Sequence, residues 1–203
     1  MNFSSFREKV AYQPILLGSF ALLASGALAW VSQATGEAIV AAEARDLRTS
    51  LSDVLPQGFA DNDLLGDTVT IERDGQPVTI YRARQRGKVR GAVFKVAERG
   101  YAADIQLLMA LDTDGTTLGV RVIKHAETPG LGDKIEAAKS PWIEGFSGKS
   151  LHQPSPAQWA VKKDGGAFEQ FAGATITPRA VVKAVKGGLA FFSAHRQEIL
   201  GEE

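Results

Sequence analysis

One stretch near the N-terminus constrains the fold more than any other. No charged residue occurs in Val10–Gly36, and within it Ile15–Val31, ILLGSFALLASGALAWV, is almost continuously apolar. Seventeen helical residues at about 1.5 Å each reach roughly 26 Å, and the flanking residues extend this to about the 30 Å of a bilayer's hydrocarbon core. Tyr12 and Trp30 stand where aromatic residues favour the membrane interface. The sequence therefore predicts one N-terminal transmembrane helix.

Charges on either side of this segment predict its orientation. Arg7 and Lys9 precede it on a short tail, and Glu37 is the first charge beyond it. Arg45 and Arg48 lie on the far side, so the bias in positive charge is modest. We expect residues 1–35 to form a cytoplasmic tail and a membrane anchor, with the main domain, residues 36–203, on the opposite side.

A cleaved signal peptide is the alternative for the same segment. Arg7 and Lys9 would form its basic region, and Ala-Leu-Ala at 27–29 resembles a cleavage site. The apolar run, however, continues past that site through Trp30 and Val31, which favours an anchor. Cleavage near Ala29 would instead leave a soluble exported protein, such as a hydrolase or a solute-binding protein.

Composition limits the remaining classes of protein. Apolar residues make up 44% and charged residues 23% of the 203 residues, which are values typical of a folded domain. Lys+Arg and Asp+Glu both number 23, and this balance argues against nucleic acid, which binds clustered cations. Cysteine is absent, so disulfides and thiolate metal sites are excluded. The histidines are scattered without metal-ligand spacing, and we expect no metal site.

Hydrophobic periodicity predicts the order of elements in the main domain. Apolar residues recur at helical spacing from about Gly36 to Leu55, where Pro56 would end an amphipathic helix. Five strand signals follow between residues 67 and 125. Beyond them, Thr177 is predicted as the N-cap of a helix and Pro178 as its first residue. The last helix is expected to continue to about Leu200. Strands followed by a closing helix predict an α+β fold with a mostly antiparallel sheet and flanking helices.

Two motifs are candidates for function. The first, HAETPGLGDK at 125–134, directly follows a predicted strand, and its glycines, Gly130 and Gly132, would bring bare backbone close to a ligand. Glu127 and Thr128 would add a carboxylate and a hydroxyl at the rim. Glycine and proline also mark ordinary loops, so this motif alone does not separate a site from a turn.

The second motif, FAGATITP at 171–178, places a threonine on a flexible backbone just before a helix. Gly173 permits close approach, Ala174 leaves the hydroxyl of Thr175 unshielded, and a helix N-terminus favours an anionic group. No base is at hand to make Thr175 a nucleophile, so we expect it to be the substrate of another enzyme and expect no catalytic residue in this chain. Helix capping would explain the same residues equally well.

Together, FEQFAGATITPRAVVKAV and HAETPGLGDKIE resemble the FMN-binding domain of the G subunit of Rnf-type ion-translocating electron-transport complexes. A related domain occurs in the C subunit of sodium-translocating NADH:quinone reductase. The resemblance covers nearly the whole chain. It departs from the family at Ala172, where a serine or threonine is usual, and at Glu169, where aspartate is commoner.

This resemblance implies a cofactor, its attachment and its partners. FMN would be joined through its phosphate to Thr175 by a separate flavin transferase, on the periplasmic side of a bacterial inner membrane. Leu131 and Trp142 would pack on the flavin ring. The expected cofactor-binding residues are Thr175, Gly173, Ala174, Thr177, Glu127, Thr128, Gly130, Leu131, Gly132 and Trp142.

The expected function is that of a single-span flavoprotein subunit, which passes electrons within a membrane complex that couples electron transfer to ion translocation. Its partners would be the other subunits of the complex, and it would have no complete activity alone. Two alternatives stay open, namely a C-type subunit of a sodium-translocating NADH:quinone reductase and a structural assembly subunit without a working flavin. The departures at Ala172 and Glu169 motivate the second.

Overall fold

The structure is a computed structural model that describes residues 12–73 and 75–201. By its internal contacts the chain divides into two compact units, Met1–Asp46 and Leu47–Glu203. The units meet within one long helix, α2, which runs from Tyr12 to Asp53. The predicted tail residues Arg7 and Lys9 lie outside the described residues. The predicted domain boundary at residue 35 stays a prediction.

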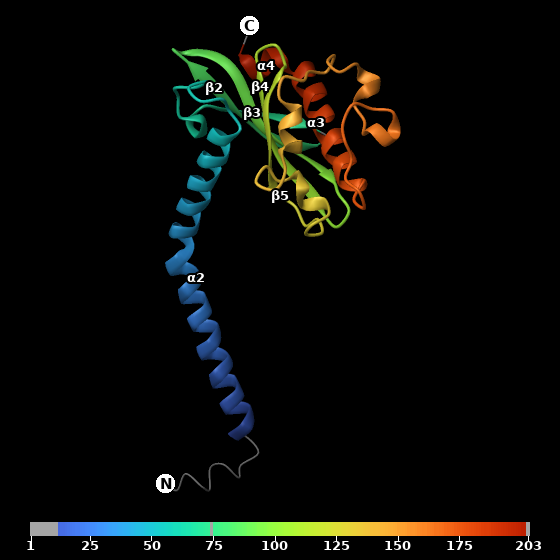
Figure 1. The fold of residues 1–203 in the computed structure, drawn as a ribbon. Helices are drawn as coiled ribbons and strands as arrows, with labels where there is room; N and C mark the ends of the chain where they lie inside the picture. Colours follow the sequence, from blue (N-terminus) through green and yellow to red (C-terminus); the bar gives the residue numbers. More distant parts are fainter. Residues whose placement is uncertain (1–11, 74, 202–203) are drawn as a thin grey trace. The chain divides into compact units, whose positions relative to one another are not determined.

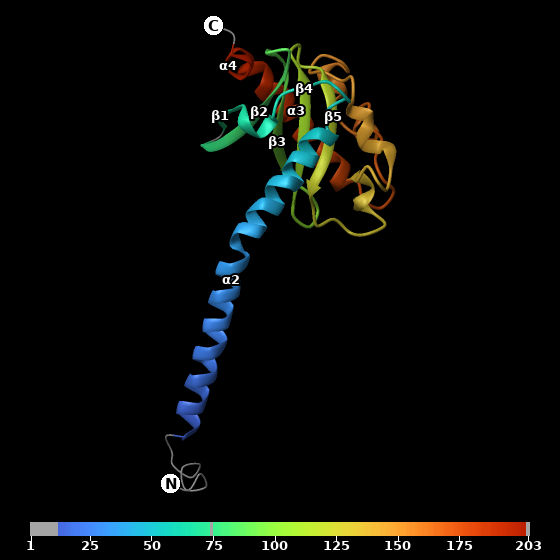
Figure 2. The same ribbon diagram turned by 90° about the vertical axis from the view of Figure 1, so that its left-hand side faces the viewer.

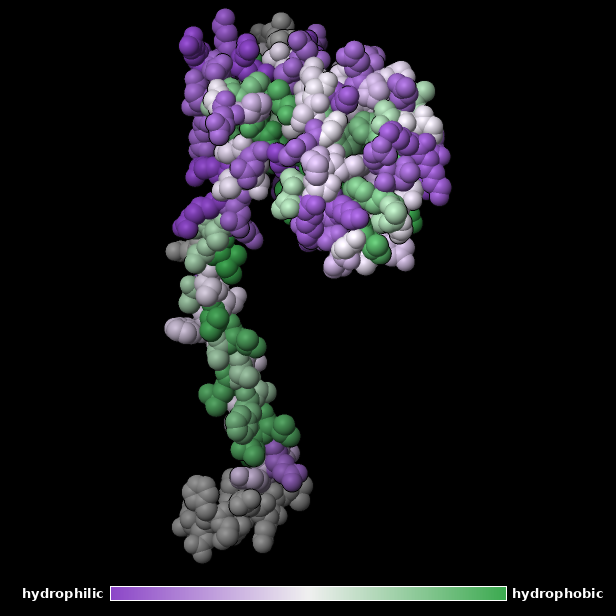
Figure 3. Space-filling model, viewed as in Figure 1, coloured by the Kyte–Doolittle hydropathy of each residue, from purple (hydrophilic) through white to green (hydrophobic). Residues whose placement is uncertain are grey.

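The N-terminal part of α2 has the properties expected of the predicted anchor. Tyr12–Gly36 is 25 residues long and contains a window of 18 residues that has a mean hydropathy of 1.9 and is not buried within the protein. Figure 3 shows hydrophobic side chains around this part of the helix. By length and composition the segment could cross a membrane. No break separates it from the predicted amphipathic helix that follows, because both belong to α2.

The unit from Leu47 to Glu203 is built on one antiparallel sheet of five strands in the order β1-β2-β3-β4-β5 (Figures 1 and 2). Every neighbouring pair of strands is antiparallel. The predicted α+β class and the strand series are therefore confirmed, although Asp74 of the first hairpin lies outside the described residues. The strands are β1 (Thr68–Arg73), β2 (Gln76–Gln85), β3 (Lys88–Arg99), β4 (Asp104–Asp112) and β5 (Thr117–Lys124).

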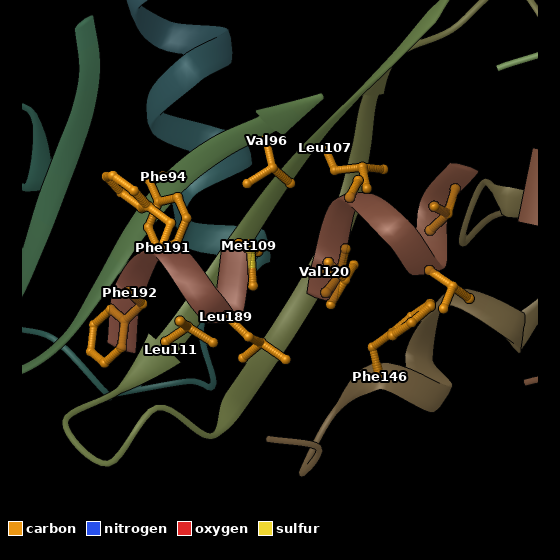
Figure 4. Packing of buried hydrophobic residues seen from close by; sticks show 14 of the residues in the cluster. Phe94, Val96, Leu107, Met109, Leu111, Val120, Phe146, Leu189, Phe191 and Phe192 are labelled. Carbon is orange, nitrogen blue, oxygen red and sulfur yellow. The ribbon is translucent and has the colours of Figure 1, made fainter. Parts of the chain in front are cut away.

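Both faces of the central strands are covered. On one face, Phe94 and Met109 join a large core with the helix α3, Ile176–Ala194 (Figure 4). On the other, Val93 and Leu108 pack with residues near the end of α2, including Leu51. Successive residues of a strand point to opposite faces, so burial on both faces explains the continuous apolar stretches at residues 91–94 of β3 and 107–111 of β4.

Close packing fixes α3 on the sheet. At Gly188 of α3, an added Cβ would lie 2.2 Å from the Met109 sulfur and 2.9 Å from Val96 Cγ1. Only a residue without a side chain therefore lets the helix approach β3 and β4 this closely. The position of the start of α3, which carries the second sequence motif, is thus set by the core.

The last helix differs from its predicted extent at both ends. It begins at Ile176 with Thr175 at the N-cap, so the prediction that Thr177 is the N-cap was wrong. Pro178 is accommodated two positions further in, as the third helical residue, because the first backbone N–H groups of a helix need no partner within it. The hydroxyl of Thr177 makes a tertiary contact instead, to Glu127.

The predicted continuous helix to Leu200 is also interrupted. His195 leaves helical geometry, and a short helix, α4, follows at Arg196–Leu200. The change of direction buries Ile199 and Leu200. It also lets Arg82 of β2 donate hydrogen bonds to the carbonyls of Ile199, at 2.7 Å, and Glu198, at 2.9 Å. Tertiary contacts therefore outweigh the helical tendency of the sequence here.

Candidate functional site

A pocket of about 260 Å³ brings the two sequence motifs together. Its walls come from the turn between β3 and β4, from the loop after β5, and from the start of α3. These segments are far apart in the chain. The antiparallel sheet places the β3–β4 turn and the end of β5 at the same end, and the hydrogen bond of Thr177 to Glu127 brings the start of α3 to them. The pocket is lined by Tyr101, Glu127, Thr128, Leu131, Gly132, Gly173, Ala174, Thr175, Ile176 and Thr177.

A tight turn shapes the loop after β5. The carbonyl of Thr128 accepts hydrogen bonds from the backbone N–H groups of Leu131 and Gly132, both at 3.1 Å. Gly130 sits in this turn with φ of 77°, a left-handed conformation that glycine adopts without a steric cost. The turn directs the half-exposed side chain of Leu131 into the pocket wall. Gly130 itself supports the turn and does not line the pocket.

Glu127 connects all three walls of the pocket. Its side chain is buried, with 5% exposed. Oε1 accepts hydrogen bonds from the backbone N–H groups of Tyr101, at 3.0 Å, and Ala102, at 3.3 Å, and Oε2 accepts one from the hydroxyl of Thr177. All three partners donate, which is the arrangement that an ionised carboxylate requires. The predicted rim residue is therefore a buried link between segments.

Two glycines leave the space that this carboxylate occupies. An added Cβ at Gly100 would lie 2.5 Å from Oε1 of Glu127. At Gly132 it would lie 2.8 Å from the Thr177 hydroxyl oxygen and 2.9 Å from Glu127 Cβ. All three distances are shorter than heavy-atom contacts in a packed protein. Gly132 was expected to allow close approach of a ligand, and it also allows the close approach of Glu127 and Thr177.

Thr175 stands at the start of α3 with its side chain partly exposed to the pocket. As the N-cap residue it has helical backbone angles and makes no side-chain capping hydrogen bond. Gly173, with φ of 80°, turns the chain just before it, and an added Cβ there would be 3.6 Å from Leu131. The hydroxyl of Thr175 therefore does not cap the helix. This argues against the alternative that the motif serves only for helix capping.

Behind the loop lies a second polar network. His125 Nδ1 accepts a hydrogen bond from the Glu127 backbone N–H at 3.1 Å, so its other nitrogen, Nε2, carries the hydrogen toward Glu136 Oε1 at 2.9 Å. The Lys139 ammonium lies 2.7 Å from Glu136 and 2.9 Å from Asp133. Its hydrogen bonds lower the pKa of both carboxyl groups, and these in turn raise the pKa of Lys139.

Trp142 occupies a neighbouring aromatic cluster and does not line the pocket. Its ring packs edge-on against Phe146 and Phe171, with centroids 5.3 and 5.2 Å away. Its Nε1–H donates a hydrogen bond to the carbonyl of Glu169 at 2.9 Å. Trp142 therefore holds the segment that precedes the second motif, and its expected contact with a flavin ring stays a prediction.

Tyr101 and Ile176 are pocket residues that the sequence did not indicate. In the described part of the unit that begins at Leu47, the exposed large hydrophobic side chains are Tyr101, Leu131 and Ile176, at 68, 43 and 47% exposure. All three line the pocket. Tyr101 lies in a turn that carries no sequence motif, so nothing in the sequence pointed to it. Ile176 could have been predicted only from its position next to Thr175.

The fold and the pocket define an FMN-binding domain. Residues 100–190 match the family described as FMN-binding domain, and this range contains every residue of the pocket. A crystal structure of NqrC from Shewanella oneidensis has the same fold, with a TM-score of 0.51 and 24% identity over 72% of this chain and 74% of that one.

The particular family follows from closer relatives. The G subunit of the ion-translocating oxidoreductase complex of Cereibacter sphaeroides is 50% identical over 187 residues, which cover 92% of this chain and 85% of the relative. Its counterpart in Pseudomonas aeruginosa is 45% identical over 203 residues, with 97 and 95% coverage. The chain belongs to this family of G subunits, as the sequence resemblance implied, and its cofactor is FMN.

The pocket fits such a cofactor in its chemistry. Exposed apolar side chains, those of Tyr101, Leu131 and Ile176, offer surfaces for an aromatic ring. The start of α3 offers backbone N–H groups to a phosphate, and the Thr175 hydroxyl stands at this position. Enclosed ligand pockets measure about 300–1,000 Å³. At about 260 Å³ the pocket would therefore hold FMN only in part.

Proposed function

We propose that this chain is a single-span membrane subunit that carries FMN on Thr175 and passes electrons within an ion-translocating complex. One observation carries the proposal: the partly exposed Thr175 opens into the pocket that also contains the loop of Glu127 to Gly132. When bound, FMN supplies reversible electron transfer. The names of the relatives, each the G subunit of an ion-translocating oxidoreductase complex, support the other subunits as partners.

The chain's own residues would position and attach the cofactor. A separate flavin transferase would transfer the FMN moiety of FAD to the Thr175 oxygen: the pyrophosphate bond of FAD breaks, AMP leaves, the hydroxyl proton is lost and a phosphate ester forms. The start of α3 favours the negative charge of that phosphate. Trp142 steadies the segment before the motif through its hydrogen bond to Glu169. The small volume of the pocket would leave part of the flavin at the surface, where an electron carrier must exchange electrons with its partners.

Attachment is tested by variants of the two nearby threonines. The full-length protein is co-expressed with a flavin transferase, denatured and separated by gel electrophoresis, and flavin fluorescence is recorded in the protein band. Thr175→Val should remove the fluorescence, because the acceptor oxygen is lost. Thr177→Ser, which keeps a hydroxyl at the buried neighbour, should retain it. Absence of fluorescence from the wild-type band would favour a structural subunit without a working flavin.

The proposed topology places the N-terminus in the cytoplasm and the main domain in the periplasm, with Tyr12–Gly36 as the span. Since the chain has no cysteine, a single introduced cysteine is its only thiol. A membrane-impermeant maleimide should label Glu144→Cys in spheroplasts and Ser4→Cys only after lysis. The reverse pattern would overturn the orientation, and a mature N-terminus near Ala29 would replace the anchor with a cleaved signal peptide.

The proposal also predicts that the subunit is a carrier with no complete reaction of its own. Purified in detergent with its flavin, the protein should be reduced by dithionite and reoxidised by an added acceptor. It should not oxidise NADH in steady turnover without other subunits. Sustained NADH turnover by the purified chain would make it an enzyme in its own right.

A further inference from the structure

Glu127 is a buried charge at the pocket that no cation neutralises within the described residues. The residue is 5% exposed and lines the pocket, and its carboxylate accepts three hydrogen bonds. The ion pairs of the described residues do not include it, and the nearby cation Lys139 pairs with Asp133 and Glu136 instead. Burial weakens the screening of such a charge by water, so its field acts on whatever occupies the pocket.

We infer that Glu127 sets the reduction potential of the flavin, holding it lower than an uncharged side chain at this position would. This inference rests on the proposed function. Reduction of the flavin by two electrons from a partner, with uptake of one proton, adds one negative charge to the occupant of the pocket. Repulsion from the Glu127 carboxylate opposes that added charge and therefore favours the oxidised cofactor.

The hydrogen bonds of Glu127 let its charge be removed without removing its contacts. In Glu127→Gln, the amide oxygen can accept the hydrogen bonds from the backbone N–H groups of Tyr101 and Ala102. The amide NH₂ can then donate to the Thr177 oxygen, because a hydroxyl both donates and accepts. A purely structural role therefore predicts little effect of this substitution, whereas an electrostatic role predicts a change in potential.

Thr177 provides the opposite perturbation through the same hydrogen bond. Thr177→Val keeps the branched shape and removes the donor to Oε2, so the full charge of Glu127 remains with less compensation. The two variants should therefore shift the potential in opposite directions, Glu127→Gln to more positive values and Thr177→Val to more negative values. Non-specific disruption of the pocket would not be expected to shift the reduction potential in opposite directions in the two variants.

The experiment is a spectroelectrochemical titration of the full-length flavinylated protein in detergent, with thermal unfolding recorded for each variant. Glu136→Gln is the matched control, since this carboxylate lies in the same loop region but is 33% exposed, pairs with Lys139 and does not line the pocket. Its potential should equal that of the wild type. Thr177→Ser should also match the wild type, because the donor is retained.

The outcomes separate this inference from the proposed function. A positive shift in Glu127→Gln with an unchanged control supports the inference, and an unchanged potential with flavin bound overturns it. If Glu127→Gln does not fold, Thr177→Val decides: a negative shift supports the inference, and no shift or a positive one overturns it. A wild-type protein without attached flavin would instead contradict the proposed function itself.

Discussion

The core beneath α3 is filled by apolar side chains such as Phe94 and Phe192 (Figure 4). The pocket at the start of the same helix is instead organised by one carboxylate, that of Glu127. In the core, many weak contacts together provide the stabilisation. The stability lost when one side chain is truncated therefore depends on the volume of the cavity that it leaves. In the pocket, a few hydrogen bonds and the space left by two glycines determine the arrangement of the residues. The two regions should therefore respond differently to substitution.

Substitution of a core aromatic should have the largest effect on stability. Phe94 is fully buried against Phe191 and the sheet, so Phe94→Ala should lower the free energy of unfolding by about 3–5 kcal/mol. Urea unfolding measures the loss. Tyr101→Ala removes an aromatic ring that is 68% exposed at the pocket and should change stability by less than about 0.5 kcal/mol. Equal losses in the two variants would contradict the distinction between core and pocket.

Loss of one hydrogen bond to Glu127 should come next. Thr177→Val leaves the buried carboxylate without one donor, so the free energy of unfolding should fall by about 1.5–3 kcal/mol, the usual range for a hydrogen bond to a charged group. Thr177→Ser should recover most of this loss in the same urea titration. A valine variant as stable as the wild type would show that the link between α3 and the loop contributes nothing.

An added methyl group tests the space around Glu127. Gly132→Ala places a Cβ 2.8 Å from the Thr177 oxygen, so we expect a loss of about 1–3 kcal/mol in the free energy of unfolding. Gly145→Ala is the matched control, because its Cβ meets nothing within 4 Å and its φ is not positive. If both variants unfold at the same urea concentration, the pocket is more adaptable than the structure indicates.

The smallest effect should come from the exposed ammonium of Lys139, and it should depend on pH. Hydrogen bonds from Lys139 lower the pKa of Asp133 and Glu136 in the folded protein. A lowered folded pKa stabilises the fold above the ordinary carboxyl pKa, and this stability is lost as pH falls through the folded pKa. Lys139→Met should therefore be less stable than the wild type at pH 7, and the difference should shrink as the pH falls below the ordinary carboxyl pKa toward the lowered folded values.

Thermal unfolding of both proteins between pH 3 and 8 measures that difference. A gap between wild type and Lys139→Met that stayed constant over this range would show that packing of the lysine stem, and not its charge, is responsible. Asp104→Asn controls for the general loss of a surface ion pair, since the Arg99–Asp104 pair is exposed on both sides.

The sequence predicted the core better than it predicted the pocket, for physical reasons. The central stretches of β3 and β4, residues 91–94 and 107–111, follow local rules, because burial on both faces requires continuous apolar residues. The role of Glu127 depends on Tyr101, Ala102 and Thr177, which reach it only after the sheet and α3 have packed. Hydrophobic periodicity in the sequence cannot predict such tertiary contacts.

The same reason accounts for the corrections at the last helix. Local propensity makes Thr177 a good N-cap, yet its hydroxyl is used by Glu127 and the helix begins at Ile176. Beyond His195 the predicted helix turns because Arg82 binds carbonyls of α4. In contrast, Thr175 and the loop of Glu127 to Gly132 were recognisable as motifs, and the structure brings them together.

Mass spectrometry of the Thr175 peptide tests the central proposal most directly. The full-length protein, co-expressed with a flavin transferase, is purified from membranes and digested with trypsin. The peptide that contains Thr175 is then fragmented. We expect its mass to exceed the sequence value by one FMN less one water, with the added mass on Thr175 and none on Thr177. An unmodified peptide, or a modification on Thr177, would contradict the assignment of Thr175 as the flavin attachment residue.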